Sequence, residues 1–219
     1  MSEIQTLIDR YDTGLAVMIY YHRHQCLPPE LSLSFAEWKG IWLNSHDDQL
    51  GQLAFAKMME APASLSELRN AYRLAVATRS GLEKPILTRI VEASNTLEEL
   101  EDAYYAAVLA ESDLEQQSAL TKIGKLDLSS AEWASFVYAS EFDDLEELAF
   151  TKVCETASTI TWLLYIYENP PEGSEPDQSV LAKIEEFNLS LDEWKEIAEV
   201  SGGVLNDLAL KKMAKLETA

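Results

Sequence analysis

The stretch from Leu128 to Val153, LSSAEWASFVYASEFDDLEELAFTKV, decides the fold of this chain. It predicts two short helices joined by a tight acidic turn. Ser129 and Glu132 have the spacing of a capping box, in which the hydroxyl accepts from a free backbone N–H and the carboxylate accepts from the N–H of the cap residue. Asp143 and Asp144 are expected to cap the second helix. Each helix spans about three turns, which is marginal alone in water, so the pair must pack against neighbours.

Two sequence marks from this stretch recur along the chain. The first opens a first helix with Ser or Thr, then Glu, then Trp or Leu, as in Ser34-x-x-Glu37-Trp38, Ser64-x-x-Glu67-Leu68, Thr96-x-x-Glu99-Leu100, Ser129-x-x-Glu132-Trp133 and Ser190-x-x-Glu193-Trp194. A sixth copy, near Thr159, keeps Trp162 but has Thr161 where the glutamate is expected. The second mark is a basic residue followed by an aliphatic one, found at Lys57-Met58, Arg89-Ile90, Lys122-Ile123, Lys152-Val153, Lys183-Ile184 and Lys212-Met213.

Both marks step by about 31 residues, and internal repeats of such a period indicate stacked helical hairpins. We therefore predict an all-α fold, a right-handed α–α superhelix of about six hairpins that forms one structural domain. Residues 1–32 do not match the repeat and are expected to form a capping helix, either continuous or broken at Gly14, and stopped by Pro28 and Pro29. The repeats are expected near 33–62, 63–94, 95–127, 128–157, 158–188 and 189–219.

Acidic residues dominate the composition. The 219 residues include 17 Lys and Arg against 38 Asp and Glu, for a net charge of −21. Phosphate binding requires a cationic face, so this balance argues against nucleic-acid binding, and it disfavours anionic membranes. Carboxylates in the first turns of helices explain part of the acidity. The remainder forms either a solvated surface or a surface that meets a basic partner.

The sequence also indicates a cytoplasmic protein. Cys26 and Cys154 lie in unrelated contexts without CxxC spacing, which is typical of reduced thiols. The N-terminus is acidic, unlike a signal peptide, and the apolar run from Leu15 to Tyr21 is far too short to span a membrane.

The fifth repeat is the outlier. Its first helix, Thr159 to Tyr167, is almost entirely apolar or aromatic, and a long loop from Glu168 to Ser174 follows. A helix that is apolar all round is either buried on both sides or covers a partner. The second alternative makes its aromatic residues contact candidates beside the acidic turns. The candidate partner-contact residues are Asp47, Asp48, Asp143, Asp144, Glu146, Glu147, Trp162, Tyr165 and Tyr167.

Aromatic residues recur at about one place per hairpin. At such spacing they are expected to form mainly the core between helices, with polar tips that reach the edge of a groove. The series is Trp38, Trp42, Tyr72, Tyr104, Trp133, Tyr138, Trp162, Tyr167 and Trp194.

No catalytic, cofactor-binding or metal-binding constellation is evident. His22, His24 and Cys26 spell H-x-H-x-C, but only His22 and Cys26 would share a helix face, and no second ligand cluster follows. His46 is alone in a turn beside Asp47. The sequence has no nucleophile with a neighbouring base motif and no Gly-rich phosphate loop. We therefore expect no enzyme, metal or cofactor; a pocket that joins these His or Cys residues to converging carboxylates would favour an enzyme instead.

The Ser/Thr-x-x-Glu-Trp/Leu opening and the Leu-Ala-x-x-Lys second helix, as in Leu148 to Val153, resemble the α-solenoid superfamily, which includes HEAT and tetratricopeptide proteins. The resemblance covers about 33–219 and looks most like a compact HEAT-like repeat. The period is shorter than the roughly 34 residues of tetratricopeptide repeats, and their Trp…Leu-Gly…Tyr signature is absent. No functional residue is therefore carried over.

This resemblance implies a scaffold that presents a curved surface to other proteins. The leading hypothesis is a non-enzymatic scaffold or adaptor for a protein partner. The alternative is an acidic inhibitor or immunity-type protein that neutralises a basic target, either a toxin or a nucleic-acid-binding protein.

Overall fold

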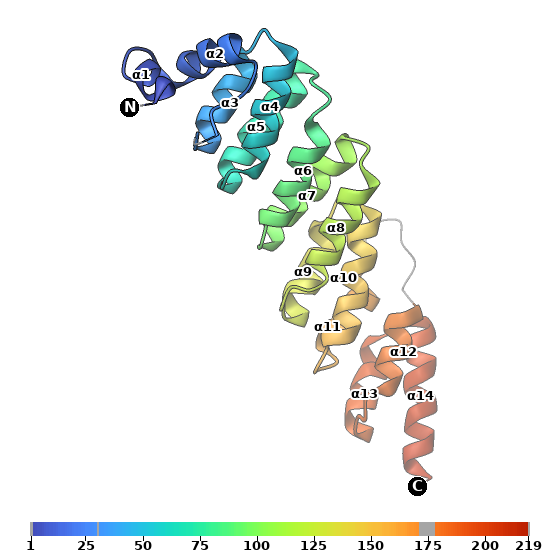
Figure 1. The fold of residues 1–219 in the computed structure, drawn as a ribbon. Coiled ribbons are helices and arrows are strands. Elements are labelled where there is room, and N and C mark those ends of the chain that lie inside the picture. The colour runs from blue at the N-terminus through green and yellow to red at the C-terminus, as the bar shows by residue number, and fades with distance from the viewer. Residues whose placement is uncertain (1, 30, 171–177, 219) are drawn as a thin grey trace. The chain divides into compact units, whose positions relative to one another are not determined.

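The computed structural model describes residues 2–29, 31–170 and 178–218, and these form helices and connecting turns with no strand (Figure 1). The all-α prediction is thus confirmed, and consecutive helices pack in pairs. The chain separates into two compact units, unit 1 at Met1–Ile123 and unit 2 at Gly124–Ala219. The handedness of the superhelix stays a prediction, and most of the long loop expected at Glu168–Ser174 lies outside the described residues.

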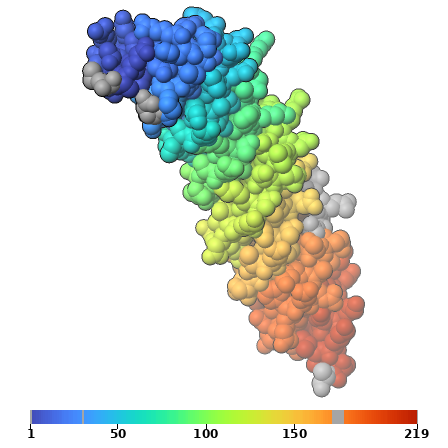
Figure 2. All heavy atoms as spheres, in the orientation of Figure 1, coloured from blue at the N-terminus to red at the C-terminus, as the bar shows by residue number. Residues whose placement is uncertain are grey.

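Unit 1 contains a helical cap and three hairpins. In the space-filling view its helices pack without a gap from blue to green (Figure 2). The first helices α3, α5 and α7 pair with the second helices α4, α6 and α8. The bounds are α1 Glu3–Ile8, α2 Thr13–His24, α3 Phe35–Asn44, α4 Asp48–Glu60, α5 Leu65–Thr78, α6 Glu83–Ala93, α7 Leu97–Leu109 and α8 Asp113–Ile123.

Unit 2 contains three further hairpins with the same order of first and second helix. Here α9, α11 and α13 are first helices, and each packs against the second helix that follows it. The bounds are α9 Ser130–Ala139, α10 Asp143–Thr156, α11 Thr161–Glu168, α12 Gln178–Glu186, α13 Leu191–Val200 and α14 Gly203–Glu217.

The N-terminal cap is two helices, and the break between them precedes Gly14. The side chain of Asp12 caps α2 by accepting from the N–H of Leu15 at 3.0 Å, which leaves Gly14 inside the helix. The end of α2 also differs from the expectation, because Gln25 adopts the left-handed conformation at φ 54° and stops the helix before Pro28.

All five predicted capping boxes are present. In each one the Ser or Thr side chain accepts from the backbone of the Glu three residues later, and that Glu accepts from the N–H of the cap residue. In α9, for example, the N–H of Ser129 donates to Glu132 at 2.8 Å. Hydrogen bonds from Ser129 lower the pKa of Glu132, and equivalent bonds lower the pKa of Glu37, Glu67 and Glu193. The pKa of Glu99 is lowered first by the N–H of Asn95 and then by that of Thr96.

The expected cap of the second helix in the fourth repeat is wrong. The helix α10 begins at Asp143 with Phe142 as its N-cap, and no side chain caps it. Asp143, Asp144 and Glu146 instead occupy the first turn, where their charges meet the positive end of the helix dipole.

A buried anchor residue follows each N-cap by four positions and fixes the packing of the first helix. Trp38, Leu68, Leu100, Trp133 and Trp194 hold this position and are all 3% exposed or less. In the fifth repeat the fully buried residue is Leu163, so the register differs by one from the prediction and Trp162 is only half-buried. Trp162 therefore falls where the other repeats have the glutamate of the capping box.

The basic residue of the second mark joins successive hairpins. Arg89 in α6 donates to the carbonyls of Met58 and Ala61 at the end of α4, at 3.2 and 3.0 Å. These contacts satisfy carbonyls that have no partner within their own helix and place a cation at its negative end.

Two further second helices repeat this arrangement. Lys122 in α8 donates to the carbonyls of Val91, Glu92 and Ser94 at 2.6–2.9 Å, and Lys212 in α14 donates to that of Glu185 at 2.8 Å. The remaining three basic residues, Lys57, Lys152 and Lys183, form ion pairs with a glutamate three residues later.

Candidate functional site

The predicted contact residues Asp47 and Asp48 lie at the start of α4 in unit 1. Asp47 caps the helix by accepting from the N–H of Leu50 at 2.9 Å, and Asp48 is exposed in the first turn. Both residues line a shallow pocket of about 280 Å³ that also contains the tilted ring pair of Trp42 and Phe55. In this place Asp47 has a structural role in capping, and Asp48 lies at the positive end of the helix dipole.

The acidic candidates of unit 2 lie in the first two turns of α10. Asp143, Asp144 and Glu147 are exposed and Glu146 is half-buried. They are spread around the helix start, and they line none of the pockets described below. Their contribution is therefore to the charge of the unit.

The aromatic candidates of the fifth repeat separate into buried and exposed residues. Leu163, Ile166 and Tyr167 face the core of unit 2, whereas Tyr165 is 49% exposed and Trp162 is half-buried. One side of α11 is thus core, and the other presents aromatic rings; that the second side covers a partner stays a prediction.

An aromatic groove lies between the first helices α9 and α11. Its volume is about 500 Å³, and it is lined by Ala134, Ser135, Tyr138, Thr161, Trp162 and Tyr165. None of these six side chains is charged. We call this hollow the α9–α11 groove.

Three rings in the α9–α11 groove support one another edge to face. The ring of Tyr165 lies 5.8 Å from that of Trp162, at 82°, and 5.7 Å from that of Tyr138, at 72°. Such edge-on pairs are favoured by about 0.5–1.5 kcal/mol each beyond the area they bury. The groove therefore presents an ordered aromatic surface.

The hydroxyl of Tyr138 holds one wall of this groove in place. It donates to the carbonyl of Asn169, the residue that follows α11, at 2.6 Å. Burial, and secondarily the neighbouring Tyr165, raises the pKa of Tyr138, so the phenol stays a donor at neutral pH.

A comparable groove in unit 1 lies between α5 and α7, with a volume of about 320 Å³. It contains two arginines, Arg69 and Arg73. Arg69 crosses the groove, and its Nη2 lies 2.9 Å from Oδ2 of Asp102, outside hydrogen-bond geometry. The hydroxyl of Tyr72 donates to the carbonyl of Ala106 at 3.1 Å, as Tyr138 does to that of Asn169. We call this hollow the α5–α7 groove.

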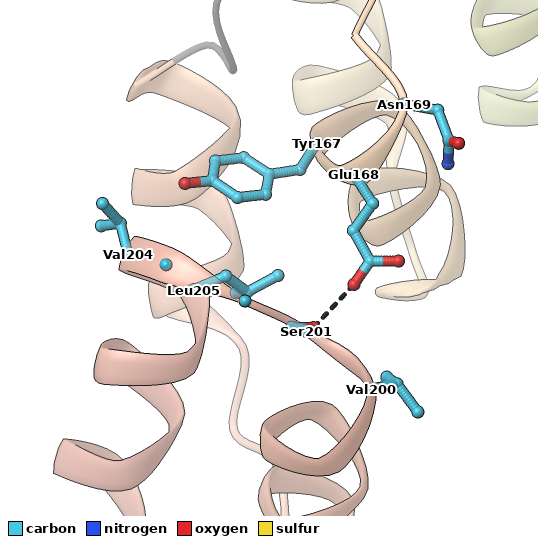
Figure 3. Close-up of a pocket in the computed structure, with 9 residues that line it drawn as sticks. Tyr167, Glu168, Asn169, Val200, Ser201, Val204 and Leu205 are labelled. Carbon is cyan, nitrogen blue, oxygen red and sulfur yellow. Dashed lines mark hydrogen bonds between the residues drawn. The ribbon is translucent and has the colours of Figure 1, made fainter.

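Tyr167 belongs to a different pocket of unit 2, of about 550 Å³ (Figure 3). It is only 8% exposed, and its ring extends toward Val204 and Leu205 at the start of α14. The carboxylate of Glu168 in this pocket accepts from Ser201 at 2.6 Å. Because that hydrogen bond already engages the carboxylate, this pocket is a weaker contact candidate than the α9–α11 groove.

The histidines and cysteines considered for chemistry are dispersed. His22, Cys26 and His46 are exposed, and Nε2 of His24 lies 3.0 Å from Glu3. Within the described residues no group of three or more His, Cys, Asp or Glu gathers as a metal site would. In the same part of the chain, no helix has the length and apolar character needed to cross a bilayer.

Sequence reasoning named Trp162 and Tyr165 but did not include Tyr138 among the contact residues. Tyr138 was grouped with core aromatics, yet it is 41% exposed. The signal that distinguishes Tyr138 is its position in the repeat. Tyr138 lies five residues after the anchor Trp133, whereas the half-buried Trp42 and Tyr72 lie four residues after their own anchors. The expectation that polar tips reach a groove edge holds for Tyr72 and Tyr138.

Comparison of the chain with protein-family models, with curated proteins and with solved structures gives no match.

Proposed function

We propose that this protein is a non-enzymatic scaffold or adaptor that binds another protein through the α9–α11 groove. The supporting observation is the edge-to-face group of the exposed Tyr138 and Tyr165 with the half-buried Trp162. Aromatic side chains are enriched in the energetically dominant parts of protein interfaces, because they bury a large area at a low cost in conformational entropy. Successive first helices provide a wider surface around the groove.

A photo-crosslinking experiment tests this proposal. Benzoylphenylalanine is introduced at Tyr165, and the full chain is irradiated in the cells from which it comes. A second protein with the crosslinker at Tyr105, an exposed tyrosine of the α5–α7 groove, is the matched control. We expect a defined protein adduct from position 165 and not from 105. Equal adduct patterns at both positions, or no protein adduct at 165, would contradict the proposal.

The charge of unit 2 favours a second candidate, an acidic inhibitor of a basic target. Unit 2 contains 20 acidic residues against 7 lysines, a net charge of −13, and it has no arginine. Such a field steers a basic protein toward the surface and makes association sensitive to salt.

The two candidates differ in their effect on the captured partner. An inhibitor abolishes the partner's own activity at a one-to-one ratio, and its binding weakens steeply when Asp143, Asp144, Glu146 and Glu147 are changed to amides. A scaffold leaves that activity intact and depends mainly on Tyr165. An activity assay of the partner, with the protein added at increasing ratios, separates these outcomes.

A further inference from the structure

We infer that the α9–α11 groove receives an arginine side chain from a basic segment of the protein partner. This inference rests on the proposed binding function and specifies the chemistry of the partner. It comes from comparing equivalent positions in the repeats, counted from the buried anchor of each first helix.

In unit 1 a basic residue one position after the anchor reaches the next first helix. Lys39 in α3 donates to Oδ1 of Asn70 in α5 at 2.8 Å, and Arg69 in α5 pairs with Asp102 in α7. Each oxygen acceptor lies two positions after its own anchor. Resident cations therefore bridge both interfaces between first helices in this unit.

In unit 2 the same position contains no cation in α9 or α11, and Lys195 in the last first helix, α13, pairs with Asp192 of its own helix. Ala134 in α9 and Leu164 in α11 take the places of Lys39 and Arg69. Tyr165 lies two positions after the anchor Leu163, on the helix opposite Ala134. It takes the place that Asp102 has in unit 1. No charged side chain lines the α9–α11 groove, whereas Arg69, Arg73 and Asp102 line the α5–α7 groove.

The surface that remains suits a guanidinium from outside. An arginine binds to aromatic faces through cation–π attraction and planar stacking, and its weak hydration lowers the cost of entering a groove. The protein uses this contact internally, because the guanidinium carbon of Arg89 lies 5.9 Å from the ring centroid of Phe35. Tyr138, Trp162 and Tyr165 offer three rings within one groove.

The charge around the groove favours a cation over an apolar guest. All six arginines of the chain lie in unit 1, and unit 2 has a net charge of −13. Glu141 and Asp143 follow Tyr138 by three and five residues, so their Cα atoms lie within roughly 11 and 18 Å of that wall of the groove. A basic segment thus meets aromatic rings in the groove of a unit whose net charge is −13.

Calorimetric titration of the purified full chain tests the inference with three peptides. The first has three arginines in a glycine–serine background. The second has citrulline, the neutral isostere of arginine, at those positions, and the third has leucine. We expect the arginine peptide to bind at low salt, the citrulline peptide to bind roughly tenfold more weakly or not at all, and the leucine peptide not to bind at the same concentrations.

Matched substitutions locate the binding. Tyr165→Leu keeps an apolar side chain but removes the ring, and we expect it to weaken binding of the arginine peptide roughly tenfold. Tyr105→Leu changes a tyrosine of similar exposure in the α5–α7 groove, and we expect the affinity to stay within about twofold. Far-UV circular dichroism and urea unfolding show whether both variants keep the fold.

Three results would overturn the inference. The first is equal binding of the arginine and leucine peptides. The second is an unchanged affinity for the arginine peptide in Tyr165→Leu. The third is a change from dimer to monomer in Tyr165→Leu, measured by light scattering, because the groove would then bind a second copy of this chain. If position 165 crosslinks to a protein whose contact segment is neutral or acidic, the scaffold proposal stands and the arginine inference fails. If the arginine peptide binds but no protein crosslinks, the groove has the inferred preference for arginine and the scaffold proposal fails.

Discussion

The α5–α7 groove of unit 1 and the α9–α11 groove of unit 2 occupy the same place in the repeat but are filled differently. In unit 1 the ion pair between Arg69 and Asp102 crosses the groove. In unit 2, Ala134 and Tyr165 replace that pair, and an aromatic hollow remains. The two grooves share one backbone contact. The hydroxyl of Tyr72 donates to the carbonyl of Ala106, and that of Tyr138 donates to the carbonyl of Asn169; each carbonyl lies six residues after the anchor of its own helix. The two grooves differ at three equivalent lining positions, since Arg69, Arg73 and Asp102 of unit 1 correspond to Ala134, Tyr138 and Tyr165 of unit 2.

The largest expected effect tests the register on which this comparison depends. Trp133→Ala removes a fully buried anchor and should lower the free energy of unfolding by about 3–5 kcal/mol. Trp162→Ala removes the same side chain from a half-buried position and should cost only about 1 kcal/mol. Urea unfolding of both variants provides the measurement. Similar losses of unfolding free energy would mean that Trp162, and not Leu163, is the anchor of α11. The position of Tyr165 would then no longer correspond to that of Asp102.

The basic residues of the second helices provide the next test. Lys122→Met keeps the aliphatic stem but leaves the carbonyls of Val91, Glu92 and Ser94 without their donor, so we expect a loss of about 1–3 kcal/mol. Lys152→Met removes a pair with the exposed Glu155 and should cost at most about 1 kcal/mol. If the two losses are equal in urea unfolding, the bonds between hairpins do not stabilise unit 1.

A single substitution should make the open groove resemble the closed one. Ala134 is fully buried, so Ala134→Arg must extend its side chain into the groove, where its guanidinium competes with the incoming one; urea unfolding shows whether the variant keeps the fold. We expect the affinity for the arginine peptide to fall at least roughly tenfold, or about 1.4 kcal/mol. Ala134→Gln is the control for side-chain length without charge and should lower the affinity less. Equal losses would show that size alone closes the groove.

The smallest expected effect is a difference in acid sensitivity between the units. In unit 1, burial alone would raise the pKa of Glu115, but hydrogen bonds from Ser112 and Thr88 outweigh it and hold the pKa below its ordinary value. A carboxyl with a lowered folded pKa stabilises the fold above its unfolded pKa of about 4.3, and this contribution is lost as the pH falls through the folded pKa. Unit 1 has Glu115 and three capping boxes, whereas unit 2 has two boxes.

We therefore expect acid to loosen unit 1 before unit 2. Hydrogen-exchange protection factors, measured by mass spectrometry between about pH 6 and about pH 3, should fall further for peptides of unit 1. Glu115→Gln should reduce that difference. Lower protection in unit 2 at acid pH would mean that these carboxyls do not control the response.

The repeat and its helix starts could be predicted from the sequence because capping is local. Ser129 and Glu132 interact within one turn, and the same spacing locates four more helix starts. The prediction is wrong by one residue at Trp162, because the repeat spacing alone places the anchor at the tryptophan, whereas the buried residue is Leu163. It is also wrong for Asp143, whose place depends on how the turn enters α10.

The α9–α11 groove could be predicted only in part. The sequence indicates aromatic residues in α11, but the hollow exists because the small side chain of Ala134 faces them from another repeat. The reach of Lys122 to the end of α6 likewise depends on the packing of successive hairpins. A contact between repeats can be predicted only when the positions of both repeats are correctly aligned. An error of one residue in either repeat assigns the contact to the wrong side chain.

The backward reach of the second-helix cations has a consequence for synthesis on the ribosome. The carbonyls at the end of α6 obtain their donor only when Lys122 emerges, 28 residues after Ser94. At typical elongation rates of 5–20 residues per second, this helix end waits for roughly 1–6 s. The hairpins that end in α4, α6 and α12 therefore carry exposed acceptors during translation, and in each case the following hairpin supplies the donor.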